Sequence, residues 1–247
     1  MKDSPDYHSA IGYEGAGGGI SRELRVFDAG LRSYMLSVYN YMASGVLLTG
    51  IVALLFARSG LAQDVLTGPG PLKYLIMLAP LAFVMVLSFG LSRLSERSVK
   101  LLFWAFAGTM GLSTASIFLV YTGSSIAQTF FAVAAAFAGL SLWGYTTRRD
   151  LSGFGTFLVM GVVGLLVAMV ANLFLQSGVM QLAISAVGVL LFAGLTAYDT
   201  QRIKNLYSQV AGTDMRGKTV VMGALSLYLD FLNMFLFLLQ FMGGGRE

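Results

Sequence analysis

The sequence of 247 residues contains no cysteine and a single histidine, His8. Without cysteine the chain has no disulfide, no thiolate metal site and no cysteine nucleophile. One histidine in a polar terminal segment also excludes a histidine-based metal cluster or catalytic triad. Charge is scarce too, because Asp, Glu, Lys and Arg make up only 11% of the residues. A soluble domain carries roughly 25%, so lipid must surround much of this chain.

Hydrophobic residues make up 56% of the chain, and its mean hydropathy is +0.75. Seven apolar stretches each approach the ~20 residues that cross about 30 Å of hydrocarbon as a helix. An open sheet cannot satisfy its backbone groups in lipid. The sequence therefore predicts an all-α integral membrane protein, a bundle of seven transmembrane helices. The expected spans are 34–57, 72–92, 101–121, 125–146, 154–176, 180–200 and 219–242.

Residues 1–33 precede the first expected span and are polar and rich in glycine. No strand precedes the glycines and no Lys-Ser/Thr pair follows them, so they do not form a phosphate-binding loop. The segment also lacks the apolar core of a signal peptide. We therefore expect a flexible cytoplasmic N-terminal tail over 1–33 and a seven-span membrane domain over 34–247.

Thirteen of the 16 Lys and Arg residues fall on one side of this predicted topology. They lie in the N-terminal tail and in the segments that follow spans two, four and six. The positive-inside rule then predicts a cytoplasmic N-terminus, and seven spans place the C-terminus outside. Because topology accounts for the net charge of +4, no nucleic-acid partner is expected.

Acids inside predicted spans are costly in lipid and therefore informative. Asp230 lies about eleven residues into the seventh span, or roughly 16 Å deep. Small and polar residues share its helix face: Gly223, Ser226, Asn233 and Gln240. We expect this face to look into the bundle or a wet cavity. The alternative is that Asp230 is a structural acid that only makes hydrogen bonds inside the bundle.

Asp199 lies near the predicted cytoplasmic end of span six, with Thr196 and Arg202 on its face. Because span six descends toward the cytoplasm and span seven rises from it, Asp199 and Asp230 can lie at similar depth. Two acids in contact in a low-dielectric site tend to share one proton, and when ionised they attract a hard cation such as Ca²⁺. Such a pair would act as a proton switch, whereas an ordinary interfacial acid is the alternative for Asp199.

The segments around these acids resemble the Bax inhibitor-1 family of membrane proteins. The most specific matches are ALSLYLDFLN at 224–233 and AYDTQ at 197–201, and the resemblance runs from Asp28 onward. It implies a bacterial inner-membrane protein in which six helices surround the seventh. It also implies a pH-sensitive Ca²⁺ leak channel gated by the two acids, Asp199 and Asp230.

The resemblance also implies an arginine that latches the closed state, and this role falls on Arg93 at the end of span two. Taken alone, Arg93 is equally explained as a basic residue that snorkels to the interface, and Arg97 lies one helical turn away. One departure is that some bacterial relatives have a further acid inside span two, whereas 71–92 contains none.

The leading hypothesis is therefore a leak channel, with no enzymatic activity and no resident cofactor. Ca²⁺ would be the permeant ion, protons the regulator and the lipid bilayer the surroundings. Ser226, Asn233 and Thr196 are candidates for lining the path. Asp199 and Asp230 would attract Ca²⁺ transiently.

Two other classes of function use the same features. A regulatory membrane protein would bind a membrane-anchored ATP-dependent protease, or other membrane partners, through the N-terminal tail. An intramembrane aspartyl protease also has two acids in its spans. Neither acid here has a Gly-x-Gly-Asp setting, because Asp199 follows Ala197-Tyr198 and Asp230 follows Tyr228-Leu229. The protease hypothesis is therefore the least favoured of the three.

Overall fold

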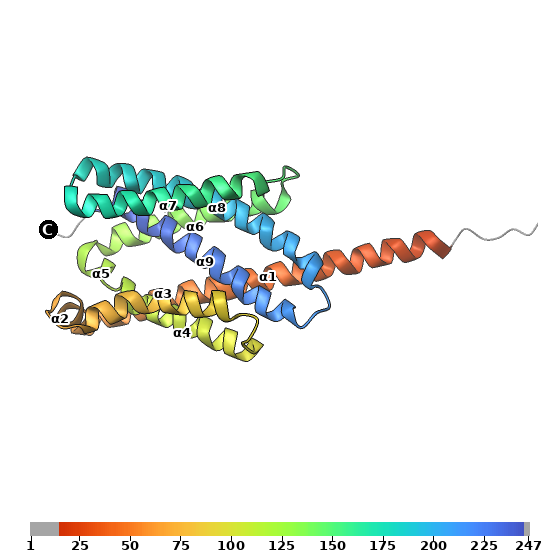
Figure 1. The fold of residues 1–247 in the computed structure, drawn as a ribbon, viewed down its shortest axis with the longest axis horizontal. Helices are drawn as coiled ribbons and strands as arrows, with labels where there is room; N and C mark the ends of the chain where they lie inside the picture. The colour runs from red at the N-terminus through yellow and green to blue at the C-terminus, as the bar shows by residue number, and fades with distance from the viewer. Residues whose placement is uncertain (1–14, 245–247) are drawn as a thin grey trace, which may run out of the picture.

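The computed structural model describes the backbone of residues 15–244 and the side chains of residues 26–244. Within this range seven helical segments are long and apolar enough to cross a membrane, which confirms the predicted all-α membrane bundle. The helices are α1 (Gly15–Arg58), α2 (Leu61–Thr67), α3 (Leu72–Gly90), α4 (Glu96–Thr114), α5 (Ile117–Val120), α6 (Gly123–Thr146), α7 (Ser152–Leu175), α8 (Gly178–Val210) and α9 (Met215–Met242) (Figure 1).

The last helix, α9, is the centre of the bundle. Its most apolar window is 72% buried, against 11–28% for the other six spans. It packs against α1, α4, α6 and α8. In Figure 1 it runs between a group formed by α6, α7 and α8 and a second group formed by α1, α3 and α4. The expected central place of the seventh span is therefore confirmed, and four of the other six spans pack directly on it.

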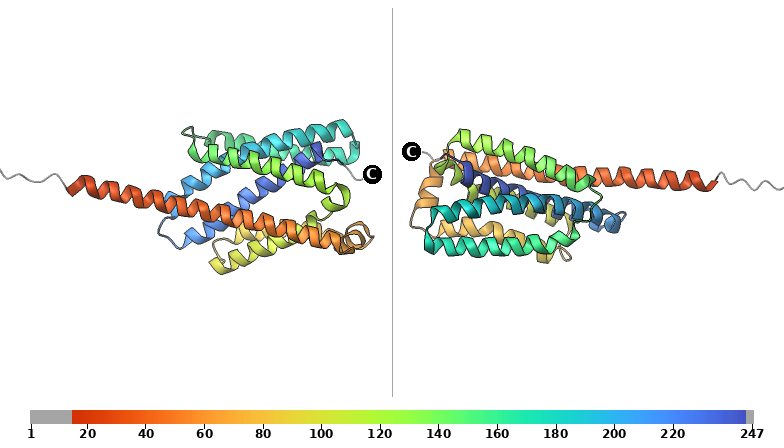
Figure 2. Two further views of the ribbon diagram at one scale, coloured as in Figure 1. Left: turned by 180° about the vertical axis from the view of Figure 1, so that it is seen from behind. Right: turned by 90° about the horizontal axis from the view of Figure 1, so that it is seen from above.

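The first helix begins earlier than the sequence suggested. We expected a flexible tail over 1–33 and a first span from residue 34, whereas the helix α1 starts at Gly15 and continues for 44 residues. At 1.5 Å per residue it is about 66 Å long, and its N-terminal part projects from the bundle (Figures 1 and 2). No proline lies between Pro5 and Pro69. Because proline is the residue that breaks a helix, the polar segment before the first span can continue the helix in water. Residues 1–14 lie outside the described part of the chain.

The third span is interrupted near its end. α4 stops at Thr114 and the single turn of α5 follows, although the two together form one membrane crossing. The hydroxyl of Thr114 donates to the carbonyl of Met110 at 2.8 Å. The N–H of Ala115 bonds to the carbonyl of Leu112, three residues back. Side-chain bonds and a tightened last turn of this kind compete with the regular helical ladder.

Very short links reverse the chain before α6 and α8. The hydroxyl of Thr122 accepts a bond from the N–H of Ser125, and that of Ser177 accepts one from Met180. These are N-caps, which satisfy N–H groups that a helix leaves unpaired. Gln176, at the end of α7, takes a left-handed backbone with φ of 49°. Across the second link α7 and α8 pack side by side, whereas the first link joins the third span to α6, which belongs to the other group of helices.

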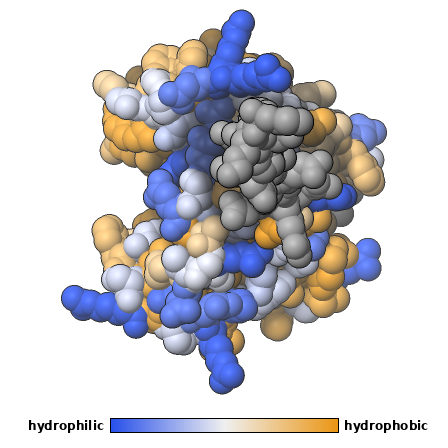
Figure 3. Space-filling model, turned by 90° about the vertical axis from the view of Figure 1, so that its right-hand side faces the viewer, coloured by the Kyte–Doolittle hydropathy of each residue, from blue (hydrophilic) through white to orange (hydrophobic). Residues whose placement is uncertain are grey.

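The outer surface fits a lipid environment. Large apolar side chains such as Phe89, Leu173 and Phe174 are exposed on the flanks of the bundle. Hydrophilic residues instead gather at the end from which α1 projects (Figure 3). That end carries most of the Lys and Arg residues.

Candidate functional site

The polar face predicted on the last span lies against α8. At one end, a Cβ added to Gly223 would come 3.1 Å from Cγ2 of Ile203 on α8. At the other end, the side-chain amide of Gln181 on α8 donates to Oε1 of Gln240 at 2.9 Å. Because both ends of the face contact the same helix, the α8–α9 interface contains the whole polar stripe, including Asp230.

Asp230 occupies the middle of this interface and is only 4% exposed. Its Oδ2 atom has no hydrogen-bond partner among the described residues. A buried polar atom without a partner is costly. The alternative of a purely structural acid needs such bonds, so the observed environment argues against it. In a native structure such a group calls for an explanation, such as a functional role or a bound water or ion.

Asp199 lies on α8 and is the ionisable group whose charge acts on Asp230. Its side chain is 13% exposed and lies 3.9 Å from Nη1 of Arg202, one turn further along α8. Arg202 is 66% exposed, so this ion pair is weak and screened by water. The two acids are therefore electrostatically linked, with Asp199 on the wetter side and Asp230 buried.

No hydrogen bond joins the two carboxyl groups in the described part of the chain. They interact through space across the α8–α9 interface. The sequence predicts a proton shared directly between Asp199 and Asp230, and this conformation does not show one. A mutual effect on ionisation remains, because it needs only charges that are close and poorly solvated.

Comparison of the sequence with known proteins shows which family the chain belongs to. The family model described as inhibitor of apoptosis-promoting Bax1 matches residues 31–247. The chain belongs to the Bax inhibitor-1 family. An uncharacterised protein of Rickettsia prowazekii is 44% identical over 226 residues, covering 90% of this chain and 94% of its own. A Caulobacter vibrioides protein is 44% identical over 230 residues, covering 89% and 92%. The Escherichia coli K12 inner membrane protein YbhL is 43% identical over 220 residues, covering 88% and 94%.

The Bax inhibitor-1 resemblance assigns the latch to Arg93, which lies in the turn after α3. Its N–H bonds to the carbonyl of Gly90, and its side chain is exposed. Among the described residues Arg93 makes no ion pair, and the cation beside Asp199 is Arg202. The end of α3 is instead tied to α9 by Lys218, whose ammonium donates to the carbonyl of Leu91 at 3.3 Å.

The residues expected to line a path differ in their settings. Thr196 is fully buried and donates to the carbonyl of Phe192 in its own helix. The amide of Asn233 likewise donates within α9, to the carbonyl of Leu229 at 2.8 Å. Ser226 is half-buried on the polar stripe. In this conformation Thr196 and Asn233 are satisfied within their own helices, which leaves the two acids as the distinctive groups of the interface.

The structure also shows a chain of hydroxyl groups that the sequence reading missed. The hydroxyl of Tyr39 on α1 bonds to that of Ser141 on α6 at 2.5 Å. Ser141 in turn bonds to the hydroxyl of Thr200 on α8 at 2.9 Å. Thr200 is the neighbour of Asp199 in the chain. Three helices are therefore connected by hydrogen bonds that end beside the acid pair.

A second contact holds α9 from its other side. The hydroxyl of Tyr228 bonds to that of Thr49 on α1 at 2.7 Å. Thr49 also donates to the carbonyl of Ala107 on α4 at 2.8 Å. Tyr228 is fully buried. This cluster fixes the central helix against α1 and α4, two residues before Asp230.

The acid pair supplies two carboxylate side chains as potential ligands. The described residues contain no group of three or more His, Cys, Asp and Glu side chains that could hold an ion. Ca²⁺ takes 6–8 oxygen ligands in a stable site. Two carboxylates are suited to brief attraction of a hard cation rather than to tight binding.

Proposed function

We propose that this Bax inhibitor-1 family protein is a pH-sensitive Ca²⁺ leak channel of the bacterial inner membrane, gated by Asp199 and Asp230. Its N-terminus would lie in the cytoplasm and its C-terminus outside. The observation that carries the proposal is the carboxyl of Asp230, buried on the central helix with one oxygen unpartnered, while Asp199 lies on α8, the helix that packs most extensively on α9. The relative named as an inner membrane protein supports the location.

The chemistry follows from the position of the pair. When both acids are ionised, they repel each other and attract a divalent cation, which neutralises both. When protons neutralise them, that attraction is lost. Asp199 is the partly exposed member, so cations and protons from the side that carries Lys and Arg would reach it before Asp230.

Opening would require α8 and α9 to separate at that end. Gly223 packs so closely on Ile203 that an added methyl group would crowd it. Arg202 partly neutralises Asp199 near the same end. The conformation described is therefore a closed one in the proposed cycle. A change in ionisation of the pair would supply the repulsion that loosens the interface.

Ca²⁺ flux into proteoliposomes over roughly pH 6 to 8 tests the proposal. The wild-type protein should show flux that depends on pH. Asp199→Asn and Asp230→Asn should each flatten that dependence, because an amide does not titrate. Asp64→Asn, an exposed acid on α2, is the matched control and should leave the profile unchanged. A wild-type pH profile in both Asp199→Asn and Asp230→Asn rejects the gating pair.

A second function is favoured by the projecting part of α1 (Figure 2). A helix that extends beyond the bundle is a natural handle for a membrane-anchored ATP-dependent protease or another membrane partner. Deleting residues 1–25 should abolish such binding and leave Ca²⁺ flux intact. Loss of flux with retained binding would instead place the deleted segment in the leak mechanism.

A further inference from the structure

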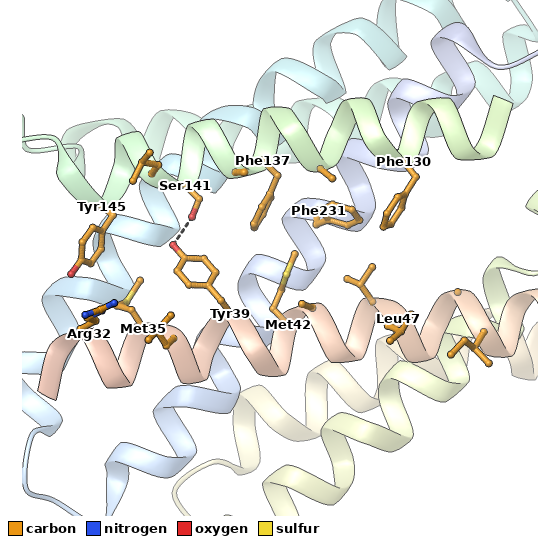
Figure 4. Close-up of a pocket in the computed structure, with 18 of the residues that line it drawn as sticks. Arg32, Met35, Tyr39, Met42, Leu47, Phe130, Phe137, Ser141, Tyr145 and Phe231 are labelled. Atoms are coloured by element: carbon orange, nitrogen blue, oxygen red, sulfur yellow. Dashed lines mark hydrogen bonds between the residues drawn. The ribbon is translucent and has the colours of Figure 1, made fainter. Parts of the chain in front are cut away.

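A long apolar groove lies between α1 and α6. Its volume is about 960 Å³. Met42 and Leu47 of α1 form one wall, Phe130 and Phe137 of α6 form the other, and Phe231 of α9 forms the floor (Figure 4). Both phenylalanines of α6 meet Phe231 edge to face at ring distances of 5.6 Å. The floor is therefore a well-packed aromatic surface.

The groove exists because α1 and α6 each pack on other helices. α1 packs mainly on α4 and α9, whereas α6 packs on α8 and α9. The hydrogen bond between Tyr39 and Ser141 crosses the gap near one end (Figure 4). Elsewhere the groove opens sideways to the surroundings of the bundle, past exposed Leu36 and Leu142.

Its length matches the membrane. The lining residues on α1 run from Arg32 to Leu54. These 22 steps along a helix span about 33 Å, close to the ~30 Å thickness of the hydrocarbon layer. The α1 wall of the groove is thus about as long as the hydrocarbon layer is thick, and Arg32 stands at one end of it.

That end is basic. The exposed Arg32 lies across the mouth of the groove from Tyr145 (Figure 4). The ammonium of Lys204 donates to the carbonyl of Tyr145 at 2.7 Å and lies 5.1 Å from the centre of its ring. Arg32 makes no salt bridge within the described residues, so its guanidinium is available to a ligand. A planar guanidinium suits a phosphate oxygen pair particularly well.

We propose that the α1–α6 groove is a binding site for one anionic phospholipid. Its phosphate would contact Arg32, and its acyl chains would lie on Phe137 and Phe231. A transmembrane helix, with its diameter of about 10 Å, is a poorer fit than two thin acyl chains. The Tyr39–Ser141 bond also bars a helix from the floor, whereas thin acyl chains can pass on either side of it.

The test is retention of lipid by the full-length protein, measured by native mass spectrometry after release from vesicles. The vesicles contain equal amounts of phosphatidylglycerol and phosphatidylcholine. We expect one phosphatidylglycerol to stay bound to the wild type. Arg32→Gln should weaken its retention about tenfold, since a charge-assisted bond is lost. Arg97→Gln, an exposed arginine outside the groove, should retain it as the wild type does.

A second pair of variants tests the apolar part of the site. Gly50 lines the groove, and a Cβ added there meets nothing within 4 Å, so Gly50→Trp should fill the space and release the lipid. Gly139 has equally open surroundings on α6 but does not line the groove, so Gly139→Trp is the matched control. Lipid loss in both tryptophan variants would show that the loss does not depend on filling the groove, and it would overturn the proposal.

Two other outcomes would also overturn it. Equal retention of both lipids, unchanged in Arg32→Gln, would identify ordinary bulk lipid without a built site. The natural chain has no cysteine, so a single Leu47→Cys provides a unique cross-linking position in the groove. Efficient disulfide dimers of this variant in membranes would assign the groove to a second copy of the chain. Absence of such dimers, together with selective retention, supports the lipid site.

Discussion

Gly144 of α6 lies directly against the backbone of Ala197 on α8, two residues before Asp199. A Cβ added to Gly144 would overlap the carbonyl oxygen of Ala197 and come within 2.9 Å of its Cα. Backbone atoms cannot move aside as a flexible side chain can. The position of Asp199 in the membrane therefore depends on a glycine in a neighbouring helix.

Gly144→Val is expected to destabilise the protein by about 1–3 kcal/mol, the usual cost of overpacking a tight contact. It should also disturb the pH dependence of flux, because α8 must shift. Gly139→Ala on the same helix should have little effect, since space is open there. Thermal unfolding in detergent and flux assays measure both. Equal stability of the two variants would contradict the close α6–α8 contact.

Replacing Thr49 and replacing Tyr228, which share a hydrogen bond, should lower the free energy of unfolding by different amounts. Tyr228→Phe leaves Thr49 still bonded to the carbonyl of Ala107. We expect a loss of about 0.5–1.5 kcal/mol, the net value of one hydrogen bond. Thr49→Val leaves the hydroxyl of Tyr228 buried without this partner, which costs about 1–3 kcal/mol. Unfolding in denaturant measures the difference, and a larger loss in Tyr228→Phe would contradict it.

Arg202 is expected to matter for flux more than for stability. Its ion pair with Asp199 is 3.9 Å long and largely exposed, so Arg202→Gln should change the free energy of unfolding by less than about 1 kcal/mol. Loss of its positive charge should raise Ca²⁺ flux about fivefold, since two charges 4 Å apart in water interact by about 1 kcal/mol.

Arg93→Gln, measured beside Arg202→Gln, tests the latch that the family resemblance assigns. An increase in flux in Arg93→Gln, with Arg97→Gln unchanged, would support that assignment. Wild-type flux in Arg202→Gln would show that the observed ion pair has no part in gating.

The N-terminal turn of α7 should respond to acid through Asp150. This carboxylate accepts bonds from the N–H and the hydroxyl of Ser152, both at 2.9 Å. These bonds lower the pKa of Asp150 from its ordinary value of 3.8. The folded form therefore favours the ionised acid. Its contribution is present above pH 3.8 and is lost as pH falls through the lower pKa of the folded state.

Hydrogen exchange at the amide of Ser152 measures this response. Its protection should fall in acid below about pH 3.8. Ser98 is the control, because its amide is bonded to the hydroxyl of Ser95, which does not titrate there. Asp150→Asn should make the protection of Ser152 independent of pH in this range. Parallel loss of protection at Ser98 would mean that general acid unfolding is the cause.

The spans and the acid pair were accessible from the sequence for a simple reason. Hydropathy over 20 residues depends on composition alone, and a lone acid such as Asp230 stands out in an apolar helix. Helical periodicity fixes which residues share a side. Gly223 and Asp230 of the predicted stripe are buried, whereas Gln240 at its end is exposed. Arg202 was placed on the face of Asp199 by its spacing of three.

The hydroxyl chain from Tyr39 to Thr200 was not accessible in this way. Serine and threonine are common in membrane helices and usually bond to their own backbone, as Thr196 does. Which of them face each other depends on how α1, α6 and α8 are rotated and tilted, and one sequence does not contain that information. The start of α1 was missed because polar composition was taken to mean non-helical chain.

The length of α1 has a mechanical consequence. A continuous helix of about 66 Å crosses a hydrocarbon layer about half as thick, so its projecting part is a lever arm with the bilayer as its fulcrum. A partner that pulls on the free end would exert torque on the buried end. That torque would reach α8, the helix that carries Asp199, through the ring contacts of Phe27 and Tyr34 with Tyr207 and through the hydrogen bonds of Tyr39.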